Sequence, residues 1–127
     1  MLKETIICIL IILLIFTFDF ITQKYTENKI EVIIKKLESL EDVIKENNIE
    51  KNQNKINDIN KSWEKIEKTL SYFLEHDEIE KIGTGLKLLT SFINSGEVNL
   101  SLSEIEKTIF ILKHIEEKNS FSLENIF

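Results

Sequence analysis

An uncharged apolar run near the N-terminus constrains this chain more than any other feature. Residues Thr5–Phe18 read TIICILIILLIFTF, and beyond Asp19 the apolar character continues to Thr22. As a helix rising 1.5 Å per residue, Thr5–Thr22 would span about 27 Å, close to the ~30 Å hydrocarbon core of a bilayer. A helix also pairs its backbone amides internally, which a membrane interior requires. The run therefore predicts a single transmembrane helix in contact with the lipid bilayer over residues 5–22, with Asp19 near the interface.

A cleaved signal peptide or a buried core helix would fit this run less well. A signal peptide needs small residues at its cleavage site, whereas the chain reads DFITQKYTEN after Phe18 and has no alanine. A core helix in a small domain should have a polar face, and this run has none. Cys8 lies within the run and follows Thr-Ile-Ile, so we expect a membrane-buried thiol and no lipoprotein anchor. We predict a retained anchor over residues 1–22 and a separate domain over residues 23–127.

Two arguments disagree about the side of the membrane on which this domain lies. Lys3 precedes the run, and four lysines follow it within fourteen residues, namely Lys24, Lys29, Lys35 and Lys36. By the positive-inside rule this asymmetry favours a cytoplasmic domain. A short tail before an uncleaved signal-like segment usually stays inside, however, and that would place the domain outside. We favour a single-pass protein of the bacterial cell membrane with an extracytoplasmic domain.

Beyond residue 22, apolar side chains recur at alternating steps of three and four, which is typical of amphipathic helices with one buried stripe. Strand-like alternation is hard to find. The predicted fold is all-α, with the transmembrane helix followed by a small bundle of three to four antiparallel amphipathic helices. Because the chain has no proline, the sequence also allows a single helix of about 40 residues that joins the anchor to the bundle. The stripes are Ile30, Ile33, Leu37, Leu40 and Ile44; Ile49, Asn52, Ile56, Ile59, Trp63, Ile66, Leu70 and Phe73; Ile79, Ile82, Leu86, Leu89 and Ile93; and Leu102, Ile105, Ile109, Leu112 and Ile115.

Polar and glycine-containing stretches predict where these helices begin and end. In chain order the signals are a turn over Asn47–Asn54, an N-cap at Asp77, a C-terminal stop at Asn94–Gly96, a capping box from Ser103 to Glu106 and an end at Asn119–Ser120. The remaining residues, Phe121–Phe127, are then a short apolar tail. This tail is too short to fold alone, so it either packs back on the bundle or docks on a partner.

The composition argues against several classes of function. The net charge of −6 and the absence of arginine exclude a basic face for nucleic acid. One cysteine excludes an internal disulfide, and two histidines leave little for a zinc site. His76 with Glu80, and His114 with Glu117, could share helix faces, but each pair reads more simply as solvated surface or helix-end charge. Without a catalytic or phosphate-binding motif, we expect no enzyme, cofactor or metal.

The residues best suited to contact a partner are few. Trp63 lies on an apolar stripe, where a core role competes with a role as a binding anchor. The polar cluster around His76 and the apolar tail are the other candidates. Gly83 and Gly85 would allow another helix to approach closely or their own helix to bend, or they reflect drift. The full candidate set for partner binding is Trp63, His76, Asp77, Glu78, Phe121, Leu123, Ile126 and Phe127.

Three segments together resemble a known bacterial family. They are Trp63 within a helix, SYFLEHDEIEKI at Ser71–Ile82 and the ending SLENIF at Ser122–Phe127, after a hydrophobic N-terminus. This combination resembles the domain of unknown function 4363 family, short membrane-anchored proteins of clostridia and related spore-formers. The resemblance implies a Gram-positive source and a membrane protein as partner, and it supplies no activity and no catalytic residues.

The observations favour a membrane-anchored, non-catalytic scaffold or interaction module, with another membrane protein or a second copy of itself as partner. A self-assembling structural subunit, either a bitopic coiled coil or a pilin-like protein, is the main alternative. A coiled coil would favour a long uninterrupted first helix and dimers, whereas the turn signals at 47–54 and 94–96 favour a compact bundle. A pilin would need a glycine before the apolar run. A ligand sensor or enzyme would need a pocket with convergent polar groups.

Overall fold

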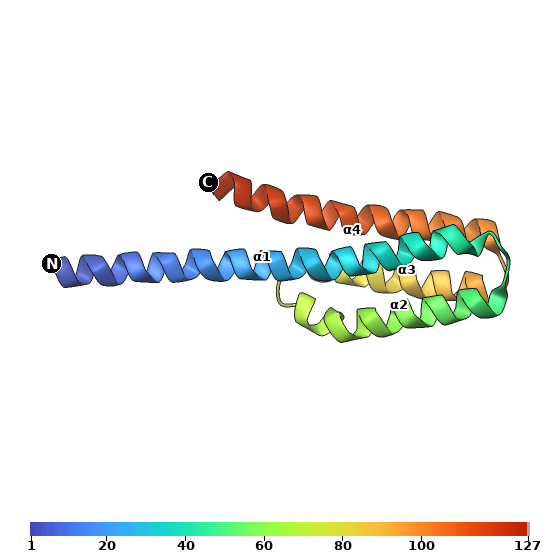
Figure 1. Ribbon diagram of the computed structural model, residues 1–127. Coiled ribbons are helices and arrows are strands. Elements are labelled where there is room, and N and C mark those ends of the chain that lie inside the picture. Colours follow the sequence, from blue (N-terminus) through green and yellow to red (C-terminus); the bar gives the residue numbers. More distant parts are fainter. Residues whose placement is uncertain (127) are drawn as a thin grey trace.

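The computed structural model describes the backbone of residues 1–126 and the side chains of residues 1–119. The described chain forms four helices and no strands, which confirms the predicted all-α fold. Consecutive helices run antiparallel, and the N-terminal part of the first one projects beyond the others (Figure 1). The helices are α1 (Leu2–Ile44), α2 (Ile49–Leu70), α3 (His76–Asn94) and α4 (Val98–Ile126).

Helix α1 combines the apolar run and the first amphipathic stripe in 43 uninterrupted residues. This settles the possibility of a long joint helix, which the absence of proline permitted. Side chains from Leu2 to Ile21 are exposed, and Thr26 is the first buried one. The helix is long and apolar enough to cross a membrane, and none of its apolar window is buried. A buried core helix would require this window to be buried. The window is exposed, so the structure does not support that interpretation of the apolar run.

The bundle closes around one core because each helix packs against two neighbours. Helix α1 contacts α2 and α4, and α3 contacts the same two helices. Most stripe positions are buried as expected, and the polar position Asn52 is buried with them. Each fully buried leucine or isoleucine stabilises the fold by about 1.5–3 kcal/mol relative to an exposed one. The core consists of Ile30, Ile33, Ile34, Leu37, Leu40, Ile44, Ile56, Ile59, Trp63, Leu70, Leu74, Ile79, Ile82, Leu86, Leu89, Ile93, Ile105, Leu112 and Ile115.

The first predicted turn is shorter in the structure than expected. Helix α2 already begins at Ile49, because the Asn48 side chain accepts a hydrogen bond from the Lys51 backbone amide at 3.1 Å. The prediction of a turn reaching Asn54 was wrong in this respect. The stop at Asn94–Gly96 is confirmed, since α3 ends at Asn94 and Gly96 adopts a positive φ of 71°.

Both predicted N-caps in the second half of the chain were wrong. Helix α3 begins at His76 after Glu75, so Asp77 lies in the first turn, where its carboxylate suits the helix dipole. Helix α4 begins at Val98, which places Ser103 and Glu106 inside it. The positive φ at Gly96 reverses the chain within a few residues, so the helix restarts before the predicted capping box.

The end of the last helix and the last residue of the second stripe also differ from prediction. Helix α4 passes Asn119 and Ser120 and continues to Ile126, so the backbone of the predicted tail is helical. No glycine or proline follows Asn119 to stop it. Phe73 is exposed and Leu74 is buried in its place, because α2 ends at Leu70 and the helical register is lost.

Candidate interaction surface

An apolar groove between α3 and α4 is the first candidate surface. It has a volume of about 760 Å³ and includes Leu88, Phe110 and Ile111. Phe110 is 72% exposed and Leu88 is 41% exposed. Phe110 follows the stripe residue Ile109, and one helical step of 100° turns it out of the core. An exposed phenylalanine offers a large apolar contact area of about 150–250 Å².

Gly85 lets the two walls of this groove approach closely. A Cβ atom at Gly85 would lie 2.8 Å from Thr108 Oγ1 of α4, a distance that ordinary packing does not allow. Gly83 has no such constraint, because its Cβ would meet Trp63 Nε1 at 3.9 Å. Of the two glycines, Gly85 is thus the one that the α3–α4 contact requires, and this supports the close-approach interpretation over drift.

Charges of both signs surround the apolar centre of the groove. Asp77, Glu80 and Lys81 line it from α3, while Glu104 and Lys107 line it from α4. An apolar centre with a polar rim is the usual composition of a protein–protein contact. The groove is therefore better suited to a protein surface than to a small polar substrate.

Trp63 and His76 share a different groove, between α2 and α3. This groove has a volume of about 660 Å³. Trp63 is only 4% exposed, and its indole N–H has no hydrogen-bond partner among the described residues. His76 Nε2 lies 3.8 Å from Glu80 Oε2, as helical spacing predicts, but both side chains are largely exposed. Such an exposed ion pair contributes little to the stability of the fold. Trp63 is a residue of the core.

The other candidate residues do not join Trp63 and His76. Asp77 lines the α3–α4 groove, and Glu78 binds Lys118 Nζ at 3.2 Å. His114 and Glu117 are exposed, but they lie inside α4, which continues to Ile126, so their predicted position at a helix end was wrong. The side chains of Phe121, Leu123 and Ile126 lie outside the described side chains, and Phe127 lies outside the described residues altogether. Among the residues that are described, no three His, Cys, Asp or Glu side chains gather to hold a metal ion.

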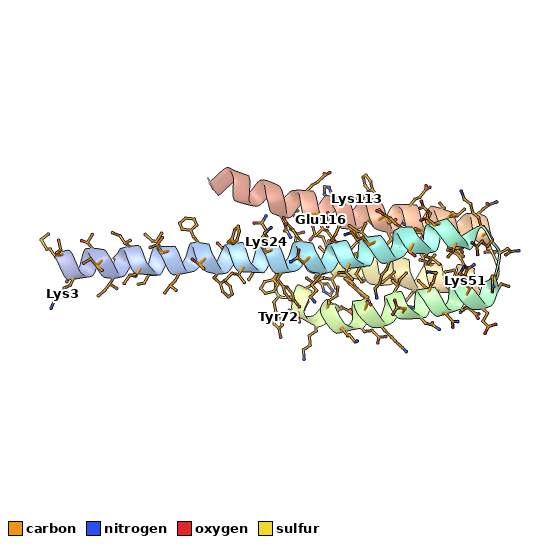
Figure 2. The ribbon with its side chains drawn as sticks, viewed as in Figure 1. Lys3, Lys24, Lys51, Tyr72, Lys113 and Glu116 are labelled. Atoms are coloured by element: carbon orange, nitrogen blue, oxygen red, sulfur yellow. The ribbon has the colours of Figure 1, made fainter. Side chains whose placement is uncertain are left out.

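Three carboxylates meet where α4 lies against α1, a feature that sequence reasoning missed. Glu27 and Glu31 of α1 face Glu116 of α4, which projects from α4 above α1 (Figure 2). Burial, a hydrogen bond with Glu31 and repulsion from Glu31 and Glu27 together raise the pKa of Glu116 from 4.5 to about 7, and the charge of Lys113 opposes them. The spacing of Glu27 and Glu31 indicates one helix face, but nothing local to it reveals Glu116, which lies 85 residues later.

We predict that this cluster makes the bundle less stable as pH rises from about 4.5 to about 7. The folded protein holds the Glu116 proton more tightly than the unfolded chain, because the pKa is raised on folding. The contribution of this group to stability is therefore greatest at low pH and is lost as pH rises through the folded pKa. Glu116→Gln should raise the free energy of unfolding by about 1 kcal/mol at pH 8, after allowance for solvent screening, and leave it unchanged at pH 4.5.

Urea unfolding of the full chain in detergent micelles, followed by Trp63 fluorescence, measures this difference. Glu106→Gln is the matched control, because Glu106 is an exposed carboxylate of the same helix. It should leave the pH dependence as it is in the unsubstituted chain. Equal stabilities of the Glu116→Gln and unsubstituted chains at pH 8 would contradict the prediction.

Comparison with known proteins assigns the bundle to a family. No curated protein and no solved structure matches the chain significantly. The family model described as "Domain of unknown function (DUF4363)" matches residues 20–126. The match includes α2, α3, α4 and the part of α1 that packs on them, and it begins near the end of the apolar run. The predicted resemblance is confirmed, and the chain belongs to the DUF4363 family.

Proposed function

We propose that this protein is a non-catalytic, single-pass interaction module of the bacterial cell membrane, whose α3–α4 groove binds another membrane protein. The exposure of Phe110 beside Leu88 is the observation on which this proposal chiefly depends. Exposing two large apolar side chains in one groove costs free energy that a partner would recover. The open shape of the grooves and their mixed lining support binding more than catalysis.

The length and exposure of the apolar half of α1 support the membrane as the place where this binding occurs. Its side chains from Leu2 to Ile21 face outward, and a single lipid-facing helix is the simplest state in which such a surface is covered. An anchored bundle stays close to the bilayer, so its most frequent encounters are with other membrane proteins. We propose that the bundle lies on the extracytoplasmic side of this membrane.

A photo-crosslinking amino acid at position 110 tests this proposal in the native membrane. We expect a discrete crosslinked species with the reactive group in place of Phe110, and none with the same group in place of Lys61, an exposed residue of α2. Leu88→Asp should abolish the species, because a charge in the groove disfavours an apolar partner. Mass spectrometry of the product then identifies a heterologous membrane protein.

Self-association through the same groove is the second candidate, and the rim supports it. Acidic and basic residues occur on both walls, so two copies related by a twofold axis could pair opposite charges. A crosslinked product at twice 14.9 kDa would identify this outcome. If positions 110 and 61 give the same pattern of products, the groove is not a specific binding surface.

A further inference from the structure

We propose that the loop between α2 and α3 forms a second membrane contact, in which Tyr72 and Phe73 enter the lipid headgroup region beside the anchor. The inference rests on the proposed transmembrane role of α1 and extends it to the bundle. Tyr72 is 75% exposed and Phe73 is 41% exposed. Both lie in the five-residue connection from Ser71 to Glu75, while the next residue after them, Leu74, is buried in the core.

The loop lies at the end of the bundle from which the apolar half of α1 emerges. Figure 2 places Tyr72 at the same level along α1 as Lys24, whereas Lys51 lies at the opposite end. Hydrogen bonds fix this position independently of the view. Gln23 Nε2 of α1 donates to the carbonyl oxygen of Asn119 at 2.8 Å, so that part of α4 is level with Gln23.

The residue before Asn119 connects the loop to the same level. Lys118 Nζ donates to Glu75 Oε1 at 2.8 Å and to Glu78 Oε1 at 3.2 Å. Glu75 is the last residue of the loop and the N-cap of α3, and Glu78 lies in the first turn of that helix. Two contacts thus connect Gln23 to the loop through neighbouring residues of α4. Tyr72 and Phe73 therefore lie level with the part of α1 at which the exposed apolar residues end and the contacts with the bundle begin.

The chemistry at this level suits a headgroup region and not free water. Tyrosine prefers the membrane interface, where its ring is in apolar surroundings and its hydroxyl is hydrated. Tyr25 of α1 is partly buried at the same end, and Lys29 Nζ lies 5.5 Å from the centre of its ring. Lys24 is exposed beside them. If residues 5–22 span the hydrocarbon core, these side chains lie just outside it.

This second contact would hold the bundle upright. A single helix leaves a domain free to tilt about the point where it leaves the membrane, whereas a loop beside the anchor gives a second point of contact. The opposite end of the bundle would then lie away from the bilayer. Leu100 lies at this opposite end, because it follows Gly96 closely in the chain and Gly96 lies beside Ile49 at the start of α2. This end is about 30 Å from the level of Gln23, which is the rise of α1 from Gln23 to Ile44.

Fluorescence quenching by lipids tests this geometry in the full chain. Trp63→Phe removes the single tryptophan, and Tyr72→Trp or Leu100→Trp then introduces one reporter. Leu100 is the matched control, because it is exposed and apolar at the far end of the bundle. The variants are reconstituted in vesicles of phosphatidylethanolamine and phosphatidylglycerol that contain a lipid with a nitroxide at a shallow acyl position.

We expect the nitroxide lipid to quench the Tyr72→Trp variant several-fold more than the Leu100→Trp variant, and aqueous iodide to show the reverse order. Equal lipid quenching of the two variants would overturn the proposal, whether both are quenched, as in a bundle lying flat, or neither is. Vesicle flotation separates this result from failure of the anchor. Chains that float but show an unquenched Tyr72→Trp reporter contradict the loop contact alone, and chains that do not float contradict both.

A second labelling scheme covers the case in which Trp63→Phe unfolds the bundle. Cys8→Ser removes the single cysteine, and Tyr72→Cys or Leu100→Cys then accepts a nitroxide spin label. We expect the label at position 72 to collide more often with oxygen, which dissolves in lipid, than with a water-soluble nickel complex. The label at position 100 should show the opposite preference, and equal ratios at both positions would overturn the proposal.

Discussion

Gly85→Leu should lower the free energy of unfolding of the bundle by about 2–3 kcal/mol, the upper part of the range for overpacking a well-packed core. Even a Cβ atom at this position would lie 2.8 Å from Thr108 Oγ1 and 3.4 Å from Glu104 Oε1. A leucine adds three further carbon atoms in the same direction. Helices α3 and α4 would have to move apart, and the core residues between them would lose contacts.

Gly83→Ala is the matched control on the same helix. Its Cβ would meet Trp63 Nε1 at 3.9 Å, an ordinary van der Waals distance. Alanine is the better helix former by about 0.8–1 kcal/mol, so this variant should be slightly more stable than the unsubstituted chain. Urea unfolding in detergent micelles, followed by helical circular dichroism, measures both variants. Destabilisation of both by the same amount would contradict a close approach specific to Gly85.

Removing the Thr108 hydroxyl tests the source of the effect. Thr108 Oγ1 is buried and has no hydrogen-bond partner among the described residues, so Thr108→Ala deletes no hydrogen bond found there. Gly85→Ala should be better tolerated in the Thr108→Ala background than alone, because the nearest atom is gone. The double-mutant cycle gives this coupling directly. A coupling of zero would show that another contact limits the space at Gly85.

The helices could be predicted from the sequence because their stripes are long and regular. Ile30 to Ile44 and Ile79 to Ile93 each repeat the three-and-four spacing over four turns, and each stripe is buried as predicted. Helix ends depend on fewer residues. Gly96 was interpreted correctly, because its left-handed conformation is one that few other residues adopt.

The predicted N-caps failed because several polar residues could serve at each place. Asp77 and Ser103 have suitable side chains for a cap, but in each case the helix begins earlier. Glycine reverses the chain at Gly96 so tightly that α4 restarts at Val98. Local preference for a cap is worth about 1 kcal/mol, and tertiary packing that extends a helix by a turn outweighs it.

The candidate surfaces were less predictable than the fold because they combine residues from different helices. Phe110 and Leu88 are 22 residues apart and share a groove only because α3 and α4 pack together at Gly85. A sequence shows Phe110 as one more apolar residue among Ile109 and Ile111. The local signal of its exposure was its position one residue after the buried stripe. Exposure of a large aromatic residue indicates a binding surface only once the position of the neighbouring helix is known.

Leu37→Ala should lower the free energy of unfolding of the bundle by about 2–5 kcal/mol, the usual cost of truncating a fully buried leucine. Leu37 is fully buried on the face of α1 that contributes to the core, and α1 packs on both α2 and α4. The missing carbons would leave a cavity in this core. A domain of this size typically has only about 5–15 kcal/mol of stability in total, so this loss is a large part of it.

Val32→Ala is the control for this truncation, because Val32 is 46% exposed on the same helix. It should change stability by no more than about 0.5 kcal/mol, the usual limit for surface substitutions. The Trp63 emission of the Leu37→Ala variant should shift at a lower urea concentration, while vesicle flotation of the chain stays the same. That combination separates the packed bundle from the apolar half of α1, since the side chains of residues 2–21 are exposed. Equal unfolding midpoints for the two variants would mean that α1 does not belong to the core and serves only as an anchor and stalk.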